Sequence, residues 1–344
     1  FSSVYFNSIV RDIEGKKMSK TLGNSPDPLD LIAKYGADAL RYGLMRIAPT
    51  GLDVKFDEKQ IEEGRNFANK LWNACRYRQM QGVAEGEAVR PNIFAIDILG
   101  KLASLEEGLD RSMGAYSFND AAQQLYQFFW SEFCDWYLEA VKGDFREDAE
   151  AGRKASTLEV MDLVFERYLQ LMHPYMPHLT EELWEKLGFG EEGALLMQKA
   201  LPGESVLRAY GIAEEDRSEA GERVAAVYES VSRVRNLKAE YNLAANRNVC
   251  LIVRPADDWV ETEGATIALL CGAKEIRFST DYEASKGTPI AVTAIGEVYL
   301  PLEGLVDLDA EKKRIEAEIA KVKKELGRSE GMLGNPKFVE NAKP

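Results

Sequence analysis

Histidine, cysteine and long apolar runs are all scarce in this sequence of 344 residues. The four cysteines form no Cys-x-x-Cys pair and no histidine lies near one, so the sequence predicts neither a zinc site nor a redox-active disulfide. No stretch approaches the ~18 consecutive apolar residues that a membrane helix requires. The first residues, FSSVYFNSIVRDIEG, also lack the basic and then apolar layout of a signal peptide. We therefore expect a cytoplasmic protein with free, mostly buried thiols, no metal site and no membrane partner.

An excess of positive charge is lacking as well, because 43 basic residues face 57 acidic ones, for a net charge of −14. This balance argues at first against a polyanionic partner, since the field of the whole protein steers association. The charge is uneven, however: residues 65–78 hold four basic and no acidic side chains, and residues 233–254 hold five basic and one acidic. Separated basic patches on an acidic protein can still bind nucleic acid.

The length allows two or three domains of about 100–200 residues, and 45% apolar with 29% charged residues exclude a disordered or fibrous chain. The chain starts at Phe1 without Met, which indicates a piece of a longer protein. Asp27-Pro28 predicts the start of a short helix, which Gly36 ends, and a second helix is predicted from Ala37 to Ile47. We interpret residues 27–60 as a connector.

Between Ile61 and Leu187 the apolar residues recur with a helical period. The clearest stripe has steps of four, four, three and four residues and comprises Leu125, Phe129, Phe133, Trp136 and Ala140. We predict four or five antiparallel helices in a domain at 61–202 with an aromatic core. The histidines His173 and His178, in HPYMPH, are interpreted as packing residues at a helix junction.

A polar, acidic, glycine-containing stretch at 203–221 predicts a linker with little structure of its own. A small α/β module is expected at 222–302, beginning with an exposed helix at 224–238. Its four strand-like runs lie at 248–255, 275–279, 289–295 and 297–302.

The last segment, 303–344, has the heptad pattern of one strand of a coiled coil. The apolar seam comprises Leu308, Ile315, Ile319, Val322 and Leu326, and Lys and Glu fill the other positions. We expect the helix to end in a turn that contains Gly327, Gly331, Gly334 and Asn335-Pro336. A lone helix of this length is marginal in water, so it needs a partner helix, and the hairpin looks cut.

The strongest chemical signal is the segment DIEGKKMSKTLGN at 12–24. Three lysines in five positions, between Gly15 and Gly23, make a cationic loop whose ammonium groups can meet several phosphate oxygens at once. From the spacing alone, a phosphate-binding loop and an ordinary surface loop both remain open.

This segment resembles the K-M-S-K-S signature of class I aminoacyl-tRNA synthetases, and GADALR at 36–41 resembles the sequence that usually follows it. HPYMPHLTEELW at 173–184 is similar to the end of the helical anticodon-binding domain of the valine, isoleucine, leucine and methionine enzymes. The run RNFANKLWNACRY, the run VRNLKAEYNL at 234–243 and the tail NPKFVENAKP are similar to bacterial valine–tRNA ligases. The resemblance covers essentially the whole chain.

The sequence departs from the family pattern in two ways. Thr21 stands where the family usually has Ser, although both carry a hydroxyl. The family's other signature, H-x-G-H, cannot be built from the two histidines, and neither the amino-acid pocket nor the editing domain can be located in the chain.

The resemblance implies a mainly α fold. Its parts would be the end of a Rossmann-type catalytic domain with the KMSK loop at 1–26, the stem-contact connector, a helical anticodon-binding bundle, the small α/β module and a partial coiled-coil tRNA-binding arm. The implied reaction is activation of valine with ATP, accompanied by Mg²⁺, and transfer to tRNA(Val) by a monomeric enzyme, with this fragment inactive alone. An isoleucine–tRNA ligase fragment and a non-enzymatic tRNA-binding module are the alternatives.

The resemblance assigns the KMSK residues to ATP. Lys20 is the first candidate, and Lys17 the second, for stabilising the negative charge that builds on the leaving pyrophosphate. Ser19 would donate a hydrogen bond and Thr21 would supply the fifth motif position, whereas Lys16 is interpreted as a solvated neighbour.

Contacts with tRNA are expected on the basic helix at 65–78, because unpaired bases are bound by stacking and by hydrogen bonds to their edges. The candidates are Lys70, Asn73, Arg76 and Tyr77, whereas Phe67, Leu71 and Trp72 are interpreted as core. A plain surface role for the four candidates stays open. A second basic strip, for the tRNA backbone, comprises Arg233, Arg235 and Lys238.

Overall fold

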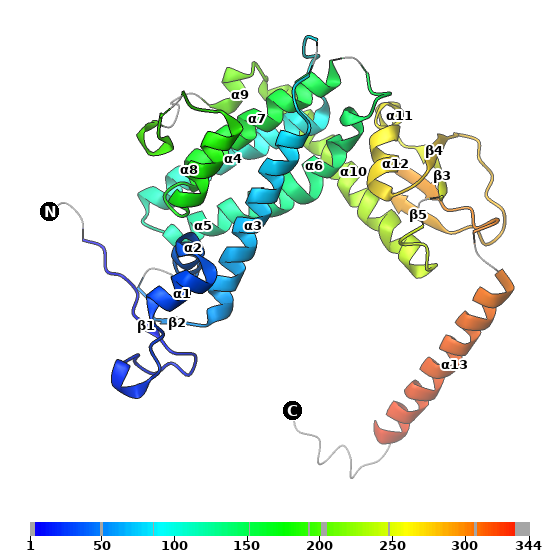
Figure 1. The fold of residues 1–344 in the computed structure, drawn as a ribbon. Helices are drawn as coiled ribbons and strands as arrows, with labels where there is room; N and C mark the ends of the chain where they lie inside the picture. Colours follow the sequence, from blue (N-terminus) through cyan, green and yellow to red (C-terminus); the bar gives the residue numbers. More distant parts are fainter. Residues whose placement is uncertain are drawn as a thin grey trace. The chain divides into compact units, whose positions relative to one another are not determined.

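The computed structural model describes residues 4–48, 51–84, 86–150, 152–191, 193–200, 205–246, 248–305 and 308–333. The chain divides into two compact units, one of residues 1–229 with 265–270 and one of residues 230–264 with 271–344 (Figure 1). Each unit is described by itself.

The N-terminal part of the first unit consists of short elements that carry the KMSK segment. Strand β1 (Val10–Arg11) pairs in parallel with β2 (Val54–Lys55), and the 3₁₀ turn η1 (Lys20–Leu22) lies in the loop that follows β1. Helices α1 (Pro28–Tyr35) and α2 (Ala37–Ile47) come next, and both predicted helices are confirmed. Asp27 caps α1 by accepting a 2.8 Å hydrogen bond from the Leu29 amide, with Pro28 in the first turn.

A small apolar cluster connects these elements to α3 (Glu58–Met80), the first long helix. It comprises Leu31, Ala39, Phe56 and Ile61, with Met18 of the loop packed against it. Two glycines allow α2 and α3 to approach closely: a Cβ on Gly64 would lie 2.6 Å from the Ala39 carbonyl oxygen, and one on Gly43 2.7 Å from that of Gln60. The loop therefore rests on a tight helix pair rather than on a flexible hinge.

The predicted helical bundle is confirmed. After α3 come α4 (Ile93–Gly114), α5 (Phe118–Gln127), the π-helix η2 (Phe128–Tyr137), α6 (Leu138–Ala140), the 3₁₀ helix η3 (Val141–Phe145), α7 (Arg153–Met172) and α8 (Pro177–Leu187). Aromatic rings fill the core: the Phe129 ring centroid lies 4.5 Å from that of Tyr168 and 6.1 Å from that of Phe67. Figure 1 shows α8 alongside α3, and contacts between these two helices confirm their adjacency.

The predicted stripe that includes Phe133 and Trp136 is partly wrong, because 128–137 is π-helical. A π-helix has a wider turn than an α-helix, so the next residue to face the core after Phe133 is the fourth along the chain instead of the third. Tyr137, 1% exposed, therefore takes the buried place and lies 5.6 Å from the Phe133 ring. Trp136 is only partly buried and stacks on Tyr228 at 4.2 Å.

The linker predicted at 203–221 is also wrong over most of its described length. The 3₁₀ helix η4 (Leu196–Gln198) lies before this stretch. Residues 206–209 form α9, and α10 (Glu214–Glu240) begins within the supposed linker. Three acidic residues in the first turn of α10 favour its positive N-terminal end, and the Arg217 guanidinium donates a 2.7 Å hydrogen bond to the Ser104 hydroxyl of α4.

The helix expected to be exposed at 224–238 is largely buried on one side. Its inward residues recur at helical spacing and comprise Val224, Val227, Val231, Val234 and Lys238. The expectation of exposure was wrong because the surrounding polar residues hide this stripe.

The second unit contains the predicted small sheet. Its strands β3 (Cys250–Pro255), β4 (Glu275–Phe278), β5 (Ile290–Thr293) and β6 (Gly296–Tyr299) lie in the order β4-β3-β6-β5. Strands β3 and β4 are parallel, and the chain between them forms α11 (Trp259–Thr262) and α12 (Gly264–Cys271), of which residues 265–270 are grouped with the first unit. The pairs β3–β6 and β5–β6 are antiparallel. All four predicted strands are confirmed.

The last described element is α13 (Leu308–Leu333). The predicted helix is confirmed, but it continues through Gly327 and Gly331, so the turn expected at these two glycines is wrong. The rest of the expected turn, from Gly334 onward, lies outside the described residues. Of the predicted seam, Ile319, Val322 and Leu326 are exposed, whereas the side chains of Leu308 and Ile315 lie outside the described part of the structure.

Candidate functional site

The KMSK segment forms a tight loop whose first half is fixed by Asp12. The Asp12 amide donates to the Lys16 carbonyl at 3.0 Å, and the Lys16 amide donates to Asp12 Oδ1 at 2.7 Å. Gly15, with φ +83°, supplies the left-handed residue that this turn needs. Arg11 and Lys17 then face each other in an antiparallel bridge.

The second half of the loop is fixed by Asn24. Its Nδ2 donates to Asp12 Oδ2 at 2.8 Å and to the Lys17 carbonyl at 3.2 Å, while its Oδ1 accepts from the Ser19 amide at 2.9 Å. The hydrogen bond from Asn24, with smaller contributions from the Lys16 and Glu14 amides, lowers the pKa of Asp12. Asp12 is therefore a carboxylate at neutral pH.

Ser19 caps the 3₁₀ turn that carries Lys20 and Thr21. Its hydroxyl oxygen accepts from the Leu22 amide at 3.2 Å, which leaves its proton available for another acceptor. Gly23, with φ +66°, closes the turn by donating its amide to the Lys20 carbonyl at 3.2 Å. Both predicted glycines thus lie where the backbone requires left-handed residues.

The three lysines of the loop differ in their surroundings. Lys16 Nζ pairs with Glu14, as befits a solvated neighbour. Lys17 and Lys20 are exposed, and within the described part of the chain neither ammonium has a hydrogen-bond or ion-pair partner. Their backbone is fixed while their charged ends remain available, an arrangement that suits an incoming polyphosphate.

On α3, the predicted tRNA-contact residues do not form a single free surface. Lys70 Nζ pairs with Asp135 Oδ1 at 2.9 Å and lies 4.9 Å from the Trp130 ring centroid. Asn73 and Arg76 are exposed. Tyr77 is half-buried, with its ring 6.2 Å from that of Phe145, and burial raises its pKa.

Arg76 faces a groove between α3 and α8 that the sequence did not reveal. The groove has a volume of about 350 Å³ and is lined by Trp72, Cys75, Arg76, Gln79, Leu183, Lys186 and Leu187. Phe67 and Leu71 are buried as predicted, but Trp72 is 37% exposed, so its interpretation as core is wrong. Lys186 Nζ lies 5.8 Å from the Trp72 ring centroid and 3.0 Å from Glu182.

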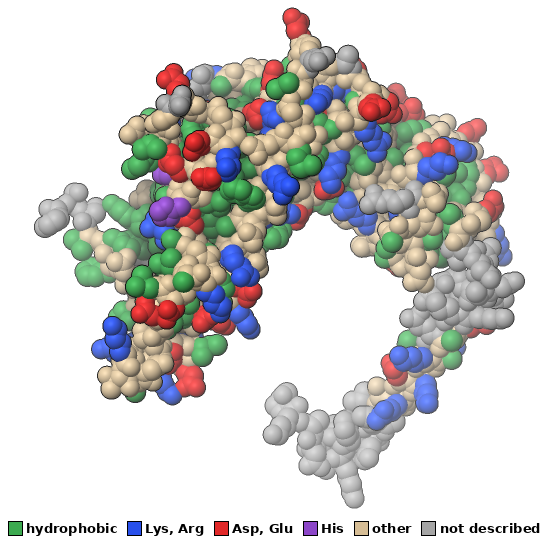
Figure 2. Space-filling view, in the orientation of Figure 1, with side chains coloured by type: hydrophobic (Ala, Val, Ile, Leu, Met, Phe, Trp, Pro, Cys, Tyr) green, Lys and Arg blue, Asp and Glu red, His purple; other side chains and the backbone are tan. Residues whose placement is uncertain are grey.

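We name this surface the α3–α8 groove and define it by Trp72, Arg76, Gln79 and Lys186. Gln79 Nε2 joins its two walls by donating to the Lys186 carbonyl at 2.7 Å. Figure 2 shows basic and acidic side chains mixed on the face where α3 is visible. The groove therefore combines an aromatic surface with cations in a setting that is not uniformly basic.

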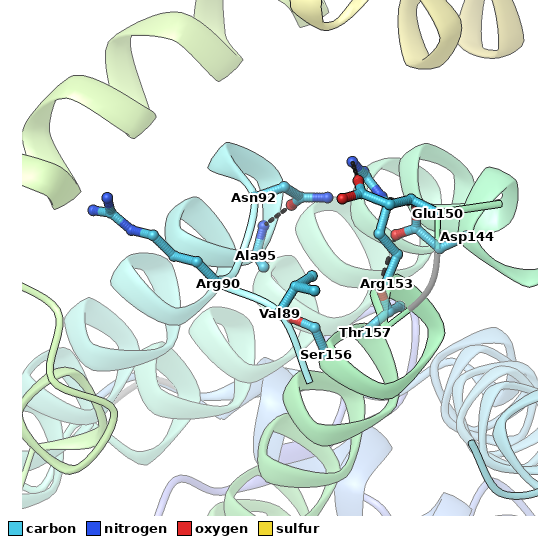
Figure 3. Close-up of a pocket in the computed structure, with 9 residues that line it drawn as sticks. All are labelled: Val89, Arg90, Asn92, Ala95, Asp144, Glu150, Arg153, Ser156 and Thr157. Atoms are coloured by element: carbon cyan, nitrogen blue, oxygen red, sulfur yellow. Dashed lines mark hydrogen bonds and ion pairs between the residues drawn. The ribbon is translucent and has the colours of Figure 1, made fainter. Parts of the chain in front are cut away.

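A second pocket, of about 240 Å³, lies where the segment before α4 meets the start of α7 (Figure 3). Its charges are paired internally: Arg153 Nε lies 2.8 Å from Asp144 Oδ1, and the Thr157 hydroxyl donates to Asp144 Oδ2 at 2.7 Å. Arg90, on its rim, pairs with Asp216 at 3.0 Å. These contacts join η3 to α7 and leave little net charge for a ligand.

The three residues of the second basic strip differ in their exposure to solvent. Arg233 and Arg235 are exposed, and Arg233 donates to the Val292 carbonyl at 2.9 Å. Lys238 is only 1% exposed, and its Nζ donates to the carbonyls of Gly272, Cys271 and Asn246 at 2.8, 3.0 and 3.1 Å. A buried ammonium with three carbonyl partners cannot meet a phosphate, so the assignment of Lys238 to the tRNA backbone is wrong.

Three family models match separate parts of the chain. The class I (I, L, M and V) tRNA synthetases match residues 1–57, the anticodon-binding domain of tRNA ligase matches 96–253, and the valyl-tRNA synthetase tRNA-binding arm matches 307–344. The chain is 35% identical to the valine–tRNA ligase of Symbiobacterium thermophilum, 38% to that of Rhizobium meliloti and 40% to that of Agrobacterium fabrum, with 100% of this chain covered each time. It belongs to the valine–tRNA ligase family.

The chain spans 40%, 36% and 36% of the length of these three relatives, and it corresponds to the C-terminal part of family members. Among solved structures, the methionyl-tRNA synthetase of Mycobacterium tuberculosis is 23% identical, over 58% of this chain and 43% of that chain, with a TM-score of 0.46. Among the described residues, no helix is both long and apolar enough to cross a membrane, and no group of three or more His, Cys, Asp or Glu side chains could hold a metal ion.

Proposed function

We propose that this chain is the C-terminal part of a valine–tRNA ligase that activates valine with ATP and transfers it to tRNA(Val). The observation that carries the proposal is the loop at 12–24, where a hydrogen-bonded backbone presents Lys17 and Lys20 without partners of their own among the described residues. A polyphosphate can therefore meet both ammonium groups without first displacing a protein carboxylate from either of them.

In this reaction the valine carboxylate attacks the α-phosphorus of ATP, and pyrophosphate leaves. Negative charge builds on the leaving group, so a cation placed there stabilises the transition state more than the ground state. Lys20 is the principal candidate and Lys17 the second. Ser19 retains a proton that it can donate to a phosphate oxygen, Thr21 presents an exposed hydroxyl beside it, and Mg²⁺ would enter bound to ATP.

The test is valine-dependent ATP–pyrophosphate exchange by the full-length protein. Lys20→Ala should slow exchange on the order of 100-fold, the effect of losing one transition-state donor. Lys16→Ala is the matched control and should change the rate little, because Lys16 pairs with Glu14. Exchange driven by isoleucine instead of valine would favour an isoleucine enzyme, and no exchange with either would favour a non-enzymatic tRNA-binding module.

We further propose that α3 supplies the bundle's contact with unpaired bases of tRNA. Asn73 and Arg76 are exposed and Tyr77 is half-buried beside them, while the α3–α8 groove adds an exposed Trp72 next to Lys186. Aromatic surfaces beside cations bind single-stranded bases by stacking, which contributes about 1–3 kcal/mol per base. Lys70 is the weakest candidate because its ammonium is already paired.

Filter binding of valine tRNA by the full-length protein tests this interface. Trp72→Ala should weaken binding about 5- to 150-fold, in line with the loss of one stacked base. Arg76→Ala should also reduce the slope of log affinity against log salt by about 0.7–0.9 if its guanidinium meets a phosphate. Met80→Ala, an exposed apolar residue on the same helix outside the groove, is the control. Equal affinities for Trp72→Ala and Met80→Ala would remove the groove from the interface.

Arg233 and Arg235 remain candidates for the tRNA backbone, and α13 belongs to the segment that matches the tRNA-binding arm. We expect the protein to act as a monomer in the cytoplasm, which sedimentation of the full-length protein and cell fractionation can test.

A further inference from the structure

One side chain, Asn24, joins both ends of the KMSK loop. Its amide donates two hydrogen bonds, to Asp12 Oδ2 and the Lys17 carbonyl, and accepts one, from the Ser19 amide. An asparagine side chain carries one carbonyl acceptor, as a peptide unit does, and two N–H donors where a peptide unit has one. Asn24 therefore binds the backbone on both sides of Met18, as a neighbouring strand would.

Asp12 extends this contact to the start of the lysine run. Its Oδ1 accepts from the Lys16 amide at 2.7 Å, while its Oδ2 accepts from Asn24. The Asp12 and Asn24 side chains together, which we call the Asp12–Asn24 clasp, touch the backbone at Lys16, Lys17 and Ser19. Lys17 is itself one of the two lysines proposed to act on pyrophosphate, Lys16 directly precedes it, and Ser19 directly precedes the other, Lys20.

A second anchor lies at the middle of the loop. Met18 packs against the apolar cluster of Leu31, Ala39, Phe56 and Ile61, which connects α1, α2 and α3. The clasp and the cluster together hold the dipeptide Met18-Ser19, which Lys17 directly precedes and Lys20 directly follows.

We infer that Asp12 and Asn24 are positioning residues for the activation of valine by ATP: they fix the backbone from which Lys17 and Lys20 reach the leaving pyrophosphate. The inference rests on the proposed function. A lysine side chain is long and flexible, so the origin of its stem decides which atoms it can meet. Displacement of a catalytic group by about 1 Å can reduce a rate about 100-fold.

The test uses the full-length protein, first with Asn24→Asp alone and then with the aspartate and the asparagine swapped between positions 12 and 24. Asn24→Asp keeps the shape and the acceptor for Ser19, but it removes both N–H donors and places a second carboxylate against Asp12. We expect this variant to lower kcat for valine-dependent ATP–pyrophosphate exchange about 10- to 100-fold, with a smaller change in KM for ATP. The double variant Asp12→Asn with Asn24→Asp restores a donor facing an acceptor and should regain part of the loss.

Two measurements separate positioning from general structure. Both residues lie in a largely exposed loop, so the melting temperature of Asn24→Asp should equal that of the wild type, as should transfer of valine from preformed valyl-adenylate to tRNA. Asn119→Asp is the matched control: Asn119 is an asparagine outside the loop that donates a 3.1 Å hydrogen bond to a neighbouring aspartate. It should leave exchange unchanged.

Three results would overturn the inference. They are wild-type exchange by Asn24→Asp, a double variant no faster than Asn24→Asp alone, and an equal loss of exchange and of transfer together with a lower melting temperature. Absence of valine-dependent exchange in the wild-type protein would instead refute the proposed function, so the two failures are distinguishable.

Discussion

A substitution of Lys238 distinguishes a role in folding from a role in tRNA binding, because the two roles predict different effects on stability. The residue is 1% exposed, and its ammonium donates to three carbonyl oxygens within 3.1 Å. These carbonyls belong to the turn after α10 and to the end of α12, so the lysine joins two segments of the second unit. The substitution Lys238→Met keeps the stem length and removes the charge and all three donors.

The expected cost follows from these contacts. A hydrogen bond to a charged group contributes about 1.5–3 kcal/mol net, but burial of the ammonium opposes this gain by several kcal/mol. Removal of the ammonium leaves three carbonyl oxygens without this donor, and each buried acceptor left without a partner costs about 1–3 kcal/mol. Since a domain is stable by only about 5–15 kcal/mol, Lys238→Met should lose a large fraction of the stability of its unit.

Hydrogen exchange of this chain can measure the effect in the second unit alone. The amides of β3 should exchange on the order of 100-fold faster or more in Lys238→Met, since each 1.4 kcal/mol is a factor of ten, whereas those of α4 should not change. Asn236→Met, at an exposed position of the same helix, is the control and should lie within about 0.5 kcal/mol of the wild type. Unchanged β3 exchange together with a shallower salt dependence of tRNA binding would refute this reasoning and return Lys238 to the tRNA surface.

Three further predictions concern the loop, its support and the arm. Gly64→Ala should lower the free energy of unfolding of the first unit by about 1–3 kcal/mol, because its Cβ would meet a backbone oxygen at 2.6 Å, whereas Gly114→Ala, with open space around it, should not; urea unfolding distinguishes them. The Asp12 carboxyl, followed by NMR, should titrate below its ordinary pKa, and its pKa should rise toward the ordinary value in Asn24→Ala. Since the folded pKa is the lower one, the clasp should be complete at neutral pH and weaken as the pH falls through the folded pKa. The amides of 316–330 should exchange quickly in this chain and more slowly in the full-length protein if a partner helix covers the exposed seam; equal exchange in both would show that no partner covers it.

Much of the architecture follows from local sequence signals. Asp27, Pro28 and Gly36 determine where α1 begins and ends, because a cap and a left-handed residue act within a few residues of the chain. The helical period of 61–187 and the strand-like runs of the second unit were correct for the same reason. The KMSK segment and its glycines could also be predicted, since a loop of this composition carries its own chemistry.

Other features depend on groups that are distant along the chain. Leu71 and Trp72 are adjacent residues with large, mainly apolar side chains, yet only the position of α8 decides that Leu71 is buried and that Trp72 lines a groove. Likewise, the charge on Lys238 suggested a surface residue, because no local pattern shows the three carbonyls that surround it. The helix that replaces the linker at 214–221 is stabilised by packing as well as by its acidic first turn.

In the KMSK loop, the sequence and the tertiary structure determine different features. The sequence alone determined which residues can meet phosphate, because the charge of Lys17 and Lys20 is a property of the residues. Only the tertiary structure decided that Asn24 joins Asp12 to the backbone around Met18, and that Met18 packs against α1–α3, because hydrogen-bond partners and apolar contacts are chosen by the fold.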